Sequence, residues 1–196
     1  RPYPADRDLH TRLTWMSGND ALAAAIISRD LERSRFETDG RFDRAIRLAD
    51  RFGSRRQRVE TRYEQLWAAF YWFDDIDRLN EGFDAVAAIA YESDDAETIE
   101  LISNLVQNLA NAAGLGHASA ESLKLEERRD DLVAALEALA ADPERPNNAL
   151  EARTSLLFTV ATRAMMARDK DALKALWPQF SEVITKAEGL SEYRAE

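Results

Sequence analysis

The sequence predicts an all-α fold, built from consecutive antiparallel helical hairpins with about eight helices in all. Apolar residues recur at the three- and four-residue spacing of an α-helix along nearly the whole chain. Short clusters of Gly, Pro, Asn and Asp divide it into segments of helical length. No segment shows the alternating pattern of a strand. The other all-α architecture compatible with these observations is a bundle of a different kind.

Turn residues divide the chain into four hairpins, expected over residues 20–53, 56–91, 94–141 and 148–189. The first hairpin is expected to turn at Asp39-Gly40, because an aspartate followed by glycine interrupts a helical pattern. One helix would then cover 20–38 and the next 41–52, with Gly53 as a C-terminal cap. A short separate helix over 5–16 is compatible with the pattern that precedes them.

The later helices follow the same logic. The pair Asp74-Asp75 is expected to end one helix and begin the next, and Ser93-Asp94-Asp95 to begin another. Pro178 should kink or split the last helix, because proline lacks the N–H that an interior position donates. The expected helices cover residues 56–73, 76–91, 94–114, 120–141, 149–167 and 169–189.

Length and composition set limits on the class of protein. A chain of 196 residues with 45% hydrophobic residues can bury one continuous core, so we expect a single helical-repeat domain over 1–196. The longest apolar run, 21–27, is far shorter than a membrane span, so we expect no membrane partner and a cytoplasmic protein. No cysteine and two histidines leave little metal or nucleophile chemistry, and no cofactor is expected. The chain begins at Arg1 without methionine, so it is expected to be a piece of a longer protein.

An internal repeat supports stacked hairpins over a closed bundle. Displacing the sequence by 34 residues pairs Phe36 with Phe70 and Gly40 with Asp74, so that a turn and its packing residues recur together. The stretches concerned are DGRFDRAI at 39–46 and FDDIDRL at 73–79. They resemble the tetratricopeptide repeat over about half of the chain. The resemblance implies an α-solenoid in which the first helix of each hairpin lines a concave groove for a protein or peptide partner.

Four consecutive rings stand in the stretch FYWFDD. On a helix Phe70, Tyr71 and Phe73 fall within one arc that we expect to be core, whereas Trp72 points nearly opposite to Phe70. The alternative for Trp72 is packing against the neighbouring hairpin. By the family resemblance, Ala68, Tyr71 and Trp72 would face the groove, with Glu64 beside them. Phe158, Met165 and Met166 on a later helix could add an apolar wall to the same groove, and core packing is the alternative for them.

Arginines gather on one flank of the helix predicted over 41–52. Arg44, Arg47 and Arg51 share one side of it, and Arg55 and Arg58 continue the positive charge beyond it. This flank could bind an acidic peptide or another anionic ligand. The alternative is a solvated face with local ion pairs such as Asp43 with Arg47. A net charge of −10 and the lack of aromatic residues on the flank make nucleic acid a weaker candidate.

The acidic stretch after the rings suggests one further chemistry. Asp74, Asp75 and Asp77 resemble the metal-binding end of class I terpenoid synthases, where carboxylates hold magnesium against a diphosphate. Arg78 stands where that family has its last acid, so capping is the favoured role. The leading hypothesis is therefore a non-enzymatic module that binds a protein or peptide within a larger bacterial regulatory protein. Anion binding is the first alternative and a magnesium-dependent enzyme the remote one.

Overall fold

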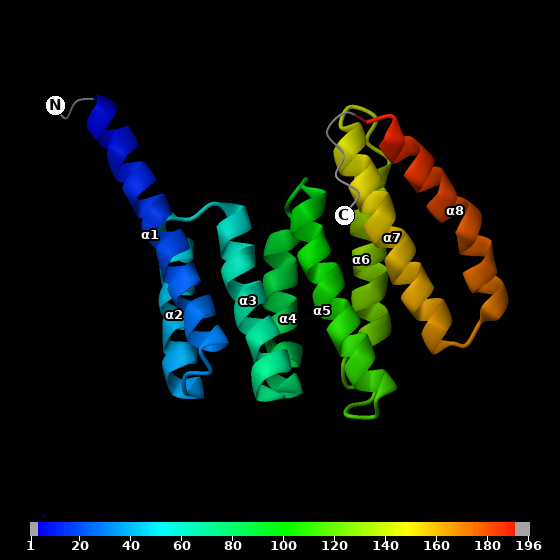
Figure 1. Ribbon diagram of the computed structural model, residues 1–196, viewed down its shortest axis with the longest axis horizontal. Helices are drawn as coiled ribbons and strands as arrows, with labels where there is room; N and C mark the ends of the chain where they lie inside the picture. Colours follow the sequence, from blue (N-terminus) through cyan, green and yellow to red (C-terminus); the bar gives the residue numbers. More distant parts are fainter. Residues whose placement is uncertain (1–3, 191–196) are drawn as a thin grey trace. The chain divides into compact units, whose positions relative to one another are not determined.

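The fold is described by a computed structural model, which covers the backbone of residues 4–190 and the side chains of residues 16–190 (Figure 1). All regular structure in this range is helical, which confirms the predicted all-α class and the number of helices. The helices are α1 Pro4–Asp30, α2 Arg35–Phe52, α3 Arg55–Phe73, α4 Ile76–Ala90, α5 Ala96–Gly114, α6 Leu125–Ala140, α7 Pro146–Met166 and α8 Lys170–Glu188.

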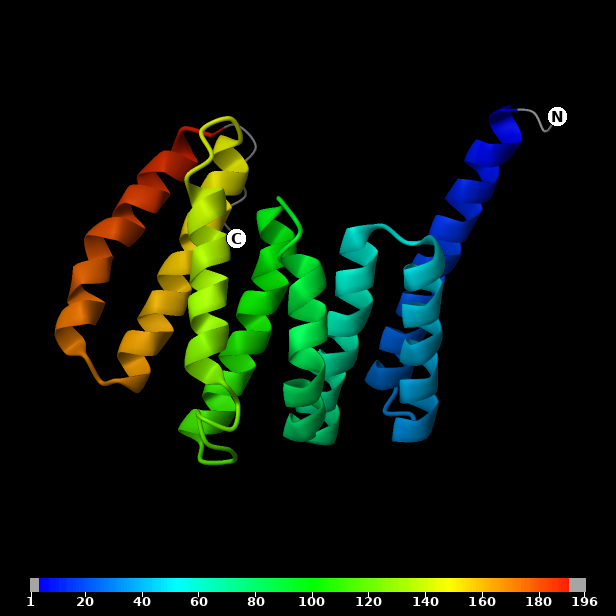
Figure 2. The ribbon, with the colours of Figure 1, turned by 180° about the vertical axis from the view of Figure 1, so that it is seen from behind.

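The chain divides into two compact units, the first over residues 1–90 and the second over 91–196. The sequence predicts one domain, whereas each of these units has packing of its own. In the first unit α1 packs on α2, α3 packs on α4, and both α1 and α2 contact α3. In the second unit α5, α6 and α7 contact one another and α8 packs on α7. Figures 1 and 2 show successive helices within each unit running in opposite directions.

The predicted first turn is wrong. Helix α1 continues to Asp30 without a break at residues 19–20, and the chain turns at 31–34 instead. Glu32 adopts a left-handed conformation there (φ 52°), and the Ser34 hydroxyl accepts a hydrogen bond from the backbone N–H of Glu37 at 3.3 Å, which caps α2. Gly40 lies inside α2. The 34-residue displacement therefore pairs an interior position of α2 with the turn after α3.

Most other boundaries follow the sequence signals. Asp74 ends α3 in a left-handed conformation (φ 49°), and the Asp95 carboxylate caps α5 by accepting from the Thr98 backbone N–H at 3.2 Å. Helix α6 begins at Leu125, five residues later than expected, because the residues before it form turns. Pro178 does not split α8, which continues through it.

Small residues allow close packing in the first unit. Ala25, Phe42 and Ala68 form one buried cluster, to which α1, α2 and α3 each contribute a residue. Between α3 and α4, a Cβ atom placed on Gly82 would lie 2.6 Å from Cδ2 of the buried Leu66. A side chain at position 82 would therefore overlap with Leu66, and the absence of one lets these helices approach.

The second unit has two apolar layers. Helices α5 and α6, which contact each other and α7, bury a stripe of leucine and isoleucine side chains. The stripe consists of Ile99, Ile102, Leu105, Leu109, Leu132 and Leu136. A second cluster joins α7 to α8 through Leu150, Leu157, Leu176 and Val183. Between residues 4 and 190 no helix has both the length and the apolar character needed to cross a membrane.

Candidate functional site

Trp72 does not project freely from the first unit. It lies on the last turn of α3 with 41% of its surface exposed, and the Arg29 guanidinium of α1 lies 4.3 Å from the centroid of its ring. Arg29 also donates to Glu64 Oε2 at 2.7 Å. A partly desolvated cation over an indole ring contributes about 1–2 kcal/mol. One face of Trp72 is therefore covered by a neighbouring helix, and Glu64, predicted to bind a partner, is engaged in an internal ion pair.

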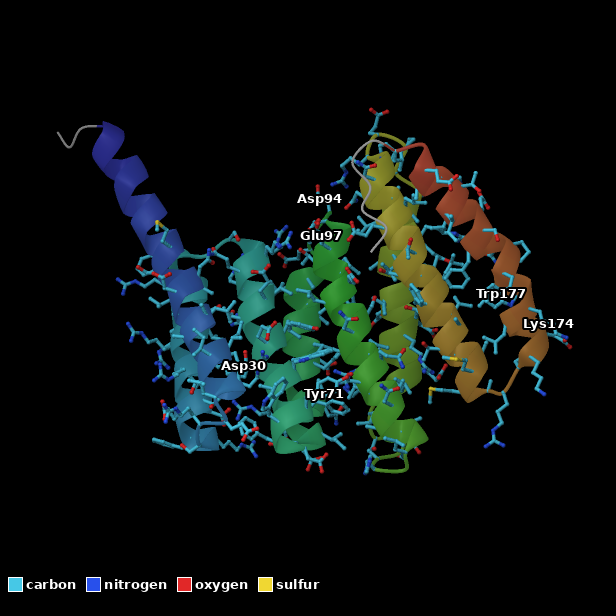
Figure 3. The ribbon with its side chains drawn as sticks, viewed as in Figure 1. Asp30, Tyr71, Asp94, Glu97, Lys174 and Trp177 are labelled. Atoms are coloured by element: carbon cyan, nitrogen blue, oxygen red, sulfur yellow. The ribbon has the colours of Figure 1, made fainter. Side chains whose placement is uncertain are left out.

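Two other predicted groove residues occupy different environments. Ala68 is 1% exposed and packs against Ala25 and Phe42, so it belongs to the core and not to an open surface. Tyr71, expected in the core arc, is half exposed near the end of α3 (Figure 3) and packs edge-on against the Phe70 ring at 4.9 Å. Of the four consecutive rings, Phe70 and Phe73 are partly buried while Tyr71 and Trp72 are exposed.

The predicted residues on α7 lie in the second unit and are exposed. Phe158 is 60% exposed, and its ring meets that of Phe180 on α8 at 5.5 Å in an edge-on arrangement. Met165 and Met166 are exposed near the end of the same helix. The Sδ atom of Met166 accepts a hydrogen bond from Nη2 of Arg129 at 2.8 Å. The predicted partner-binding set therefore falls into two groups, one in each unit.

A pocket of about 330 Å³ lies beside Phe158 in the second unit, and we refer to it as the α5–α7 pocket. Side chains of α5 and α7 form its walls, and Arg129 of α6 also lines it. Most of its lining residues have polar side chains, although the surface that they present to the pocket is mainly apolar. The polar side chains are Glu100, Ser103, Asn104, Gln107, Arg129, Ser155, Thr159 and Thr162.

Some of these polar groups bond to one another and others do not. Thr162 donates to Gln107 Oε1 at 2.6 Å, and Gln107 Nε2 donates in turn to Asn111 at 2.9 Å. The Ser103 hydroxyl oxygen is buried and has no hydrogen-bond partner within residues 16–190. Arg129, whose side chain is 4% exposed, pairs with Glu126 at 2.8 Å. The pocket thus holds a buried cation and a buried, unpaired hydroxyl.

Of the residues lining the pocket, only Phe158 is among the predicted site residues. A signal for the others is present in the sequence, because Glu100, Ser103, Asn104 and Gln107 recur at helical spacing opposite the apolar stripe of α5. Such a stripe is also typical of a solvated face. The spacing alone therefore does not distinguish a pocket wall from an open surface.

A second cavity, of about 740 Å³, opens among α6, α7 and α8. Several of its charged and polar groups are paired: Arg153 donates to Gln179 at 2.6 Å, and Lys186 pairs with Glu182 at 2.7 Å. The hydrogen bond from Lys186 lowers the pKa of Glu182. Compared with the α5–α7 pocket, this cavity offers fewer unsatisfied groups to a ligand.

The predicted arginine flank lies on the exposed side of α2. No carboxylate among residues 16–190 pairs with Arg44, Arg47 or Arg51, and the Arg51 guanidinium lies 4.8 Å from the centroid of the Phe52 ring. The expected pair of Asp43 with Arg47 does not form, because Asp43 accepts from Gln65 at 3.0 Å instead.

The two arginines beyond α2 differ from each other. Arg55 is exposed at the start of α3. Arg58 is half buried, and its Nε is enclosed without a hydrogen-bond partner in the described part of the chain. The flank thus presents four exposed guanidinium groups and one that is partly enclosed.

The aspartates after α3 act as helix-ending residues. Asp75 accepts from the backbone N–H of Arg78 at 2.9 Å, which caps α4, and it also pairs with Arg35. That backbone hydrogen bond and the Arg35 guanidinium lower the pKa of Asp75. The capping role predicted from the sequence is confirmed for Asp75. Within residues 16–190, no three or more acidic, His or Cys side chains lie close enough together to hold a metal ion. Asp74 and Asp77 therefore belong to no such group.

Comparison with known proteins gave no match: no family model, no curated protein and no solved structure is significantly similar to this chain.

Proposed function

We propose that the chain is a non-enzymatic helical module that binds a peptide or protein segment at the α5–α7 pocket. The observation behind the proposal is an open pocket of about 330 Å³ bordered by an exposed phenylalanine. Pockets of about 300 Å³ and above accommodate ligand groups, and exposed aromatic side chains supply large contact areas at interfaces. The module would act in the cytoplasm, within a larger bacterial regulatory protein.

The arrangement of helices supports a peptide as the ligand. The tetratricopeptide resemblance implies that the first helix of each hairpin lines the binding surface, and α5 and α7 are the first helices of the last two hairpins. Met165 and Met166 continue the apolar surface beyond Phe158 on α7. Flexible thioether side chains adapt to ligands of varied shape. A segment lying along α7 would thus meet an aromatic ring, a polar pocket and an adaptable apolar end.

Selection from a displayed random-peptide library, followed by calorimetry with the selected peptides, tests this proposal. Phe158→Ala should weaken binding about tenfold or more, as expected for an aromatic anchor. Trp177→Ala is the matched control, since Trp177 is an exposed aromatic residue of the same unit that lies on α8 and does not line the pocket (Figure 3). Circular dichroism should be unchanged for both variants. If no peptide is selected, or if both variants bind equally well, the proposal fails.

Anion binding through the arginine flank is a second candidate, favoured by the lack of carboxylate partners for Arg44, Arg47 and Arg51 in the described part of the chain. A polyglutamate peptide and a single-stranded oligonucleotide serve as probes. Binding at this flank should fall steeply as salt is raised, and replacing the three arginines with glutamine should abolish it. Binding that does not depend on salt would reject this candidate.

A further inference from the structure

Arg129 has fewer hydrogen bonds than a buried guanidinium normally makes. The group carries five N–H donors. One bonds to Glu126 Oε1 and another to the Met166 sulfur, each at 2.8 Å, and no third hydrogen bond forms within residues 16–190. A thioether sulfur is a weak acceptor, and a buried charge is stabilised mainly by strong, charge-assisted bonds. The guanidinium is therefore left with donor capacity beside the pocket that it lines.

Glu126 does not fully neutralise Arg129, because it is shared. Its second oxygen pairs with Arg163 at 2.8 Å, and Arg163 also lies 3.5 Å from Asp130. Glu126 is exposed, so water weakens its interaction with both cations. Arg129, which lines the pocket, can therefore pair with a second carboxylate.

Other donors in the pocket are unused as well. The Ser103 hydroxyl is buried without a partner, and the Asn104 side chain forms no hydrogen bond within the described range. In contrast, Thr159 donates to the backbone carbonyl of Ser155 at 2.9 Å, and Thr162 is bonded to Gln107. The unused groups are thus a cation, a hydroxyl and an amide, and all three belong to residues that line the same pocket.

We propose that the α5–α7 pocket binds a carboxylate of the peptide ligand, with Arg129 as its cationic anchor and Ser103 as a second donor. The carboxylate accepts hydrogen bonds from the Arg129 guanidinium, whose donors are only partly used by Glu126 and the weakly accepting Met166 sulfur. Glu100 also lines the pocket, and its negative charge favours a singly charged carboxylate over a doubly charged phosphate. This inference rests on the proposed function and names the chemistry that the site recognises.

A titration followed by amide NMR on the whole chain tests the inference with three small probes. The first is glutamate capped by acetyl and N-methylamide groups, the second is glutamine with the same caps, and the third is N-acetylalanine. Capped glutamate should shift the amide signals of Ser103, Gln107 and Thr162. Capped glutamine, which has the same shape without the charge, should bind at least about fivefold more weakly. Tighter binding of N-acetylalanine would assign the site to a chain terminus instead of an acidic side chain.

Four variants separate recognition from folding. Arg129→Met keeps the apolar stem and should abolish binding, but it also removes the ion pair between a buried guanidinium and the exposed Glu126, which can destabilise the unit. Ser103→Ala removes a buried, unpaired hydroxyl, so the fold should be kept while affinity falls about fivefold. Glu100→Gln should strengthen binding of capped glutamate by relieving repulsion, and Met166→Leu should leave it equal or stronger, because the competing sulfur is gone.

The inference is overturned if capped glutamate and capped glutamine bind equally, if neither binds, or if Ser103→Ala and Glu100→Gln both leave the affinity unchanged. Its failure is distinguishable from failure of the proposed function. Library peptides that require Phe158 but contain no essential acidic residue would retain the peptide-binding module and reject the carboxylate. Capped glutamate bound without any selected peptide would retain the carboxylate site and reject the peptide ligand.

Discussion

The two units differ in how they satisfy their charged groups. In the first unit arginines are paired across helices, as in Arg29 with Glu64 and Arg78 with Asp39. The Arg29 guanidinium also covers one face of the Trp72 ring. In the second unit Arg129 is buried against a thioether, and a hydroxyl beside it has no partner within residues 16–190. In the first unit Arg58 Nε is also enclosed without a hydrogen-bond partner in the described part of the chain, but the unused donors of the second unit border a cavity and therefore favour a ligand there.

Removing a core side chain from one unit should have the largest effect on the free energy of unfolding. It also tests whether the two units unfold independently. Phe42 is fully buried in the first unit, so Phe42→Ala should cost about 3–5 kcal/mol of the free energy of unfolding. Hydrogen exchange followed by mass spectrometry should show faster exchange in α1–α4 and little change in α5–α8. Equal acceleration throughout the chain would mean that the two units unfold as one.

Removing Arg29 should sharpen the contrast between paired and unpaired arginines. Arg29→Ala breaks the pair with Glu64 and uncovers Trp72, and we expect a loss of about 2 kcal/mol in urea unfolding together with a change in tryptophan fluorescence. Arg47→Ala is the control, because this exposed arginine pairs with no carboxylate in the described part of the chain and should change stability by less than about 0.5 kcal/mol. Similar losses in the two variants would contradict the internal role of Arg29.

A glycine substitution should stabilise the first unit. Gly40 lies within α2, and nothing stands within 4 Å of a Cβ placed there. Alanine exceeds glycine in helix propensity by about 1 kcal/mol, so Gly40→Ala should raise the melting temperature by a few degrees. A lower melting temperature would indicate that the chain turns at this position, as the sequence pattern alone suggests.

The smallest effect is expected at Asp75, and it should depend on pH. Its folded-state pKa is lowered, so the charge stabilises the fold above the unfolded-state pKa of about 3.9, and this contribution is lost as pH falls through the folded-state value. Asp75→Asn keeps a capping side chain but removes the charge. At neutral pH it should cost less than about 1 kcal/mol, with the difference from the native protein vanishing in acid. A difference that persists in acid would point to altered capping geometry.

Local chemistry explains which parts of the fold were predictable. The turn at Asp74 and Asp75 is encoded by residues that tolerate a left-handed backbone and cap the next helix. The turn at 31–34 contains neither glycine nor proline, whereas Gly40 is a residue that often interrupts a helix. The sequence pattern therefore places the turn between the first two helices at Gly40, about eight residues too late. Here the continuous buried stripe of α2 outweighs the low helix propensity of a single glycine.

The pocket was harder to predict because it depends on the distance between helices. Arg129 lies in the stretch LEERRDD, which is typical of a solvated helix face. It is buried because α6 packs against α5 and α7. The opposite error concerns Ala68, which is predicted to line an open groove but is buried. A small residue suits either a groove or a close contact between helices, and here Ala25 and Phe42 occupy the space beside it. The exposure of Phe158 agrees with the surface position expected for it, although its place beside a polar pocket could not be read from spacing.

The close approach of α3 and α4 gives Gly82 less mutational freedom than Gly40, another glycine of the first unit. Position 82 faces Leu66 Cδ2 at 2.6 Å from a virtual Cβ, while position 40 faces open space. In a survey of all single substitutions scored by cellular abundance, position 82 should accept fewer replacements than position 40, because the buried Leu66 side chain must shift to admit them, and shortening Leu66 should relieve this restriction. A compensating pair at 66 and 82 would then report on the contact between these helices without any need for a known ligand.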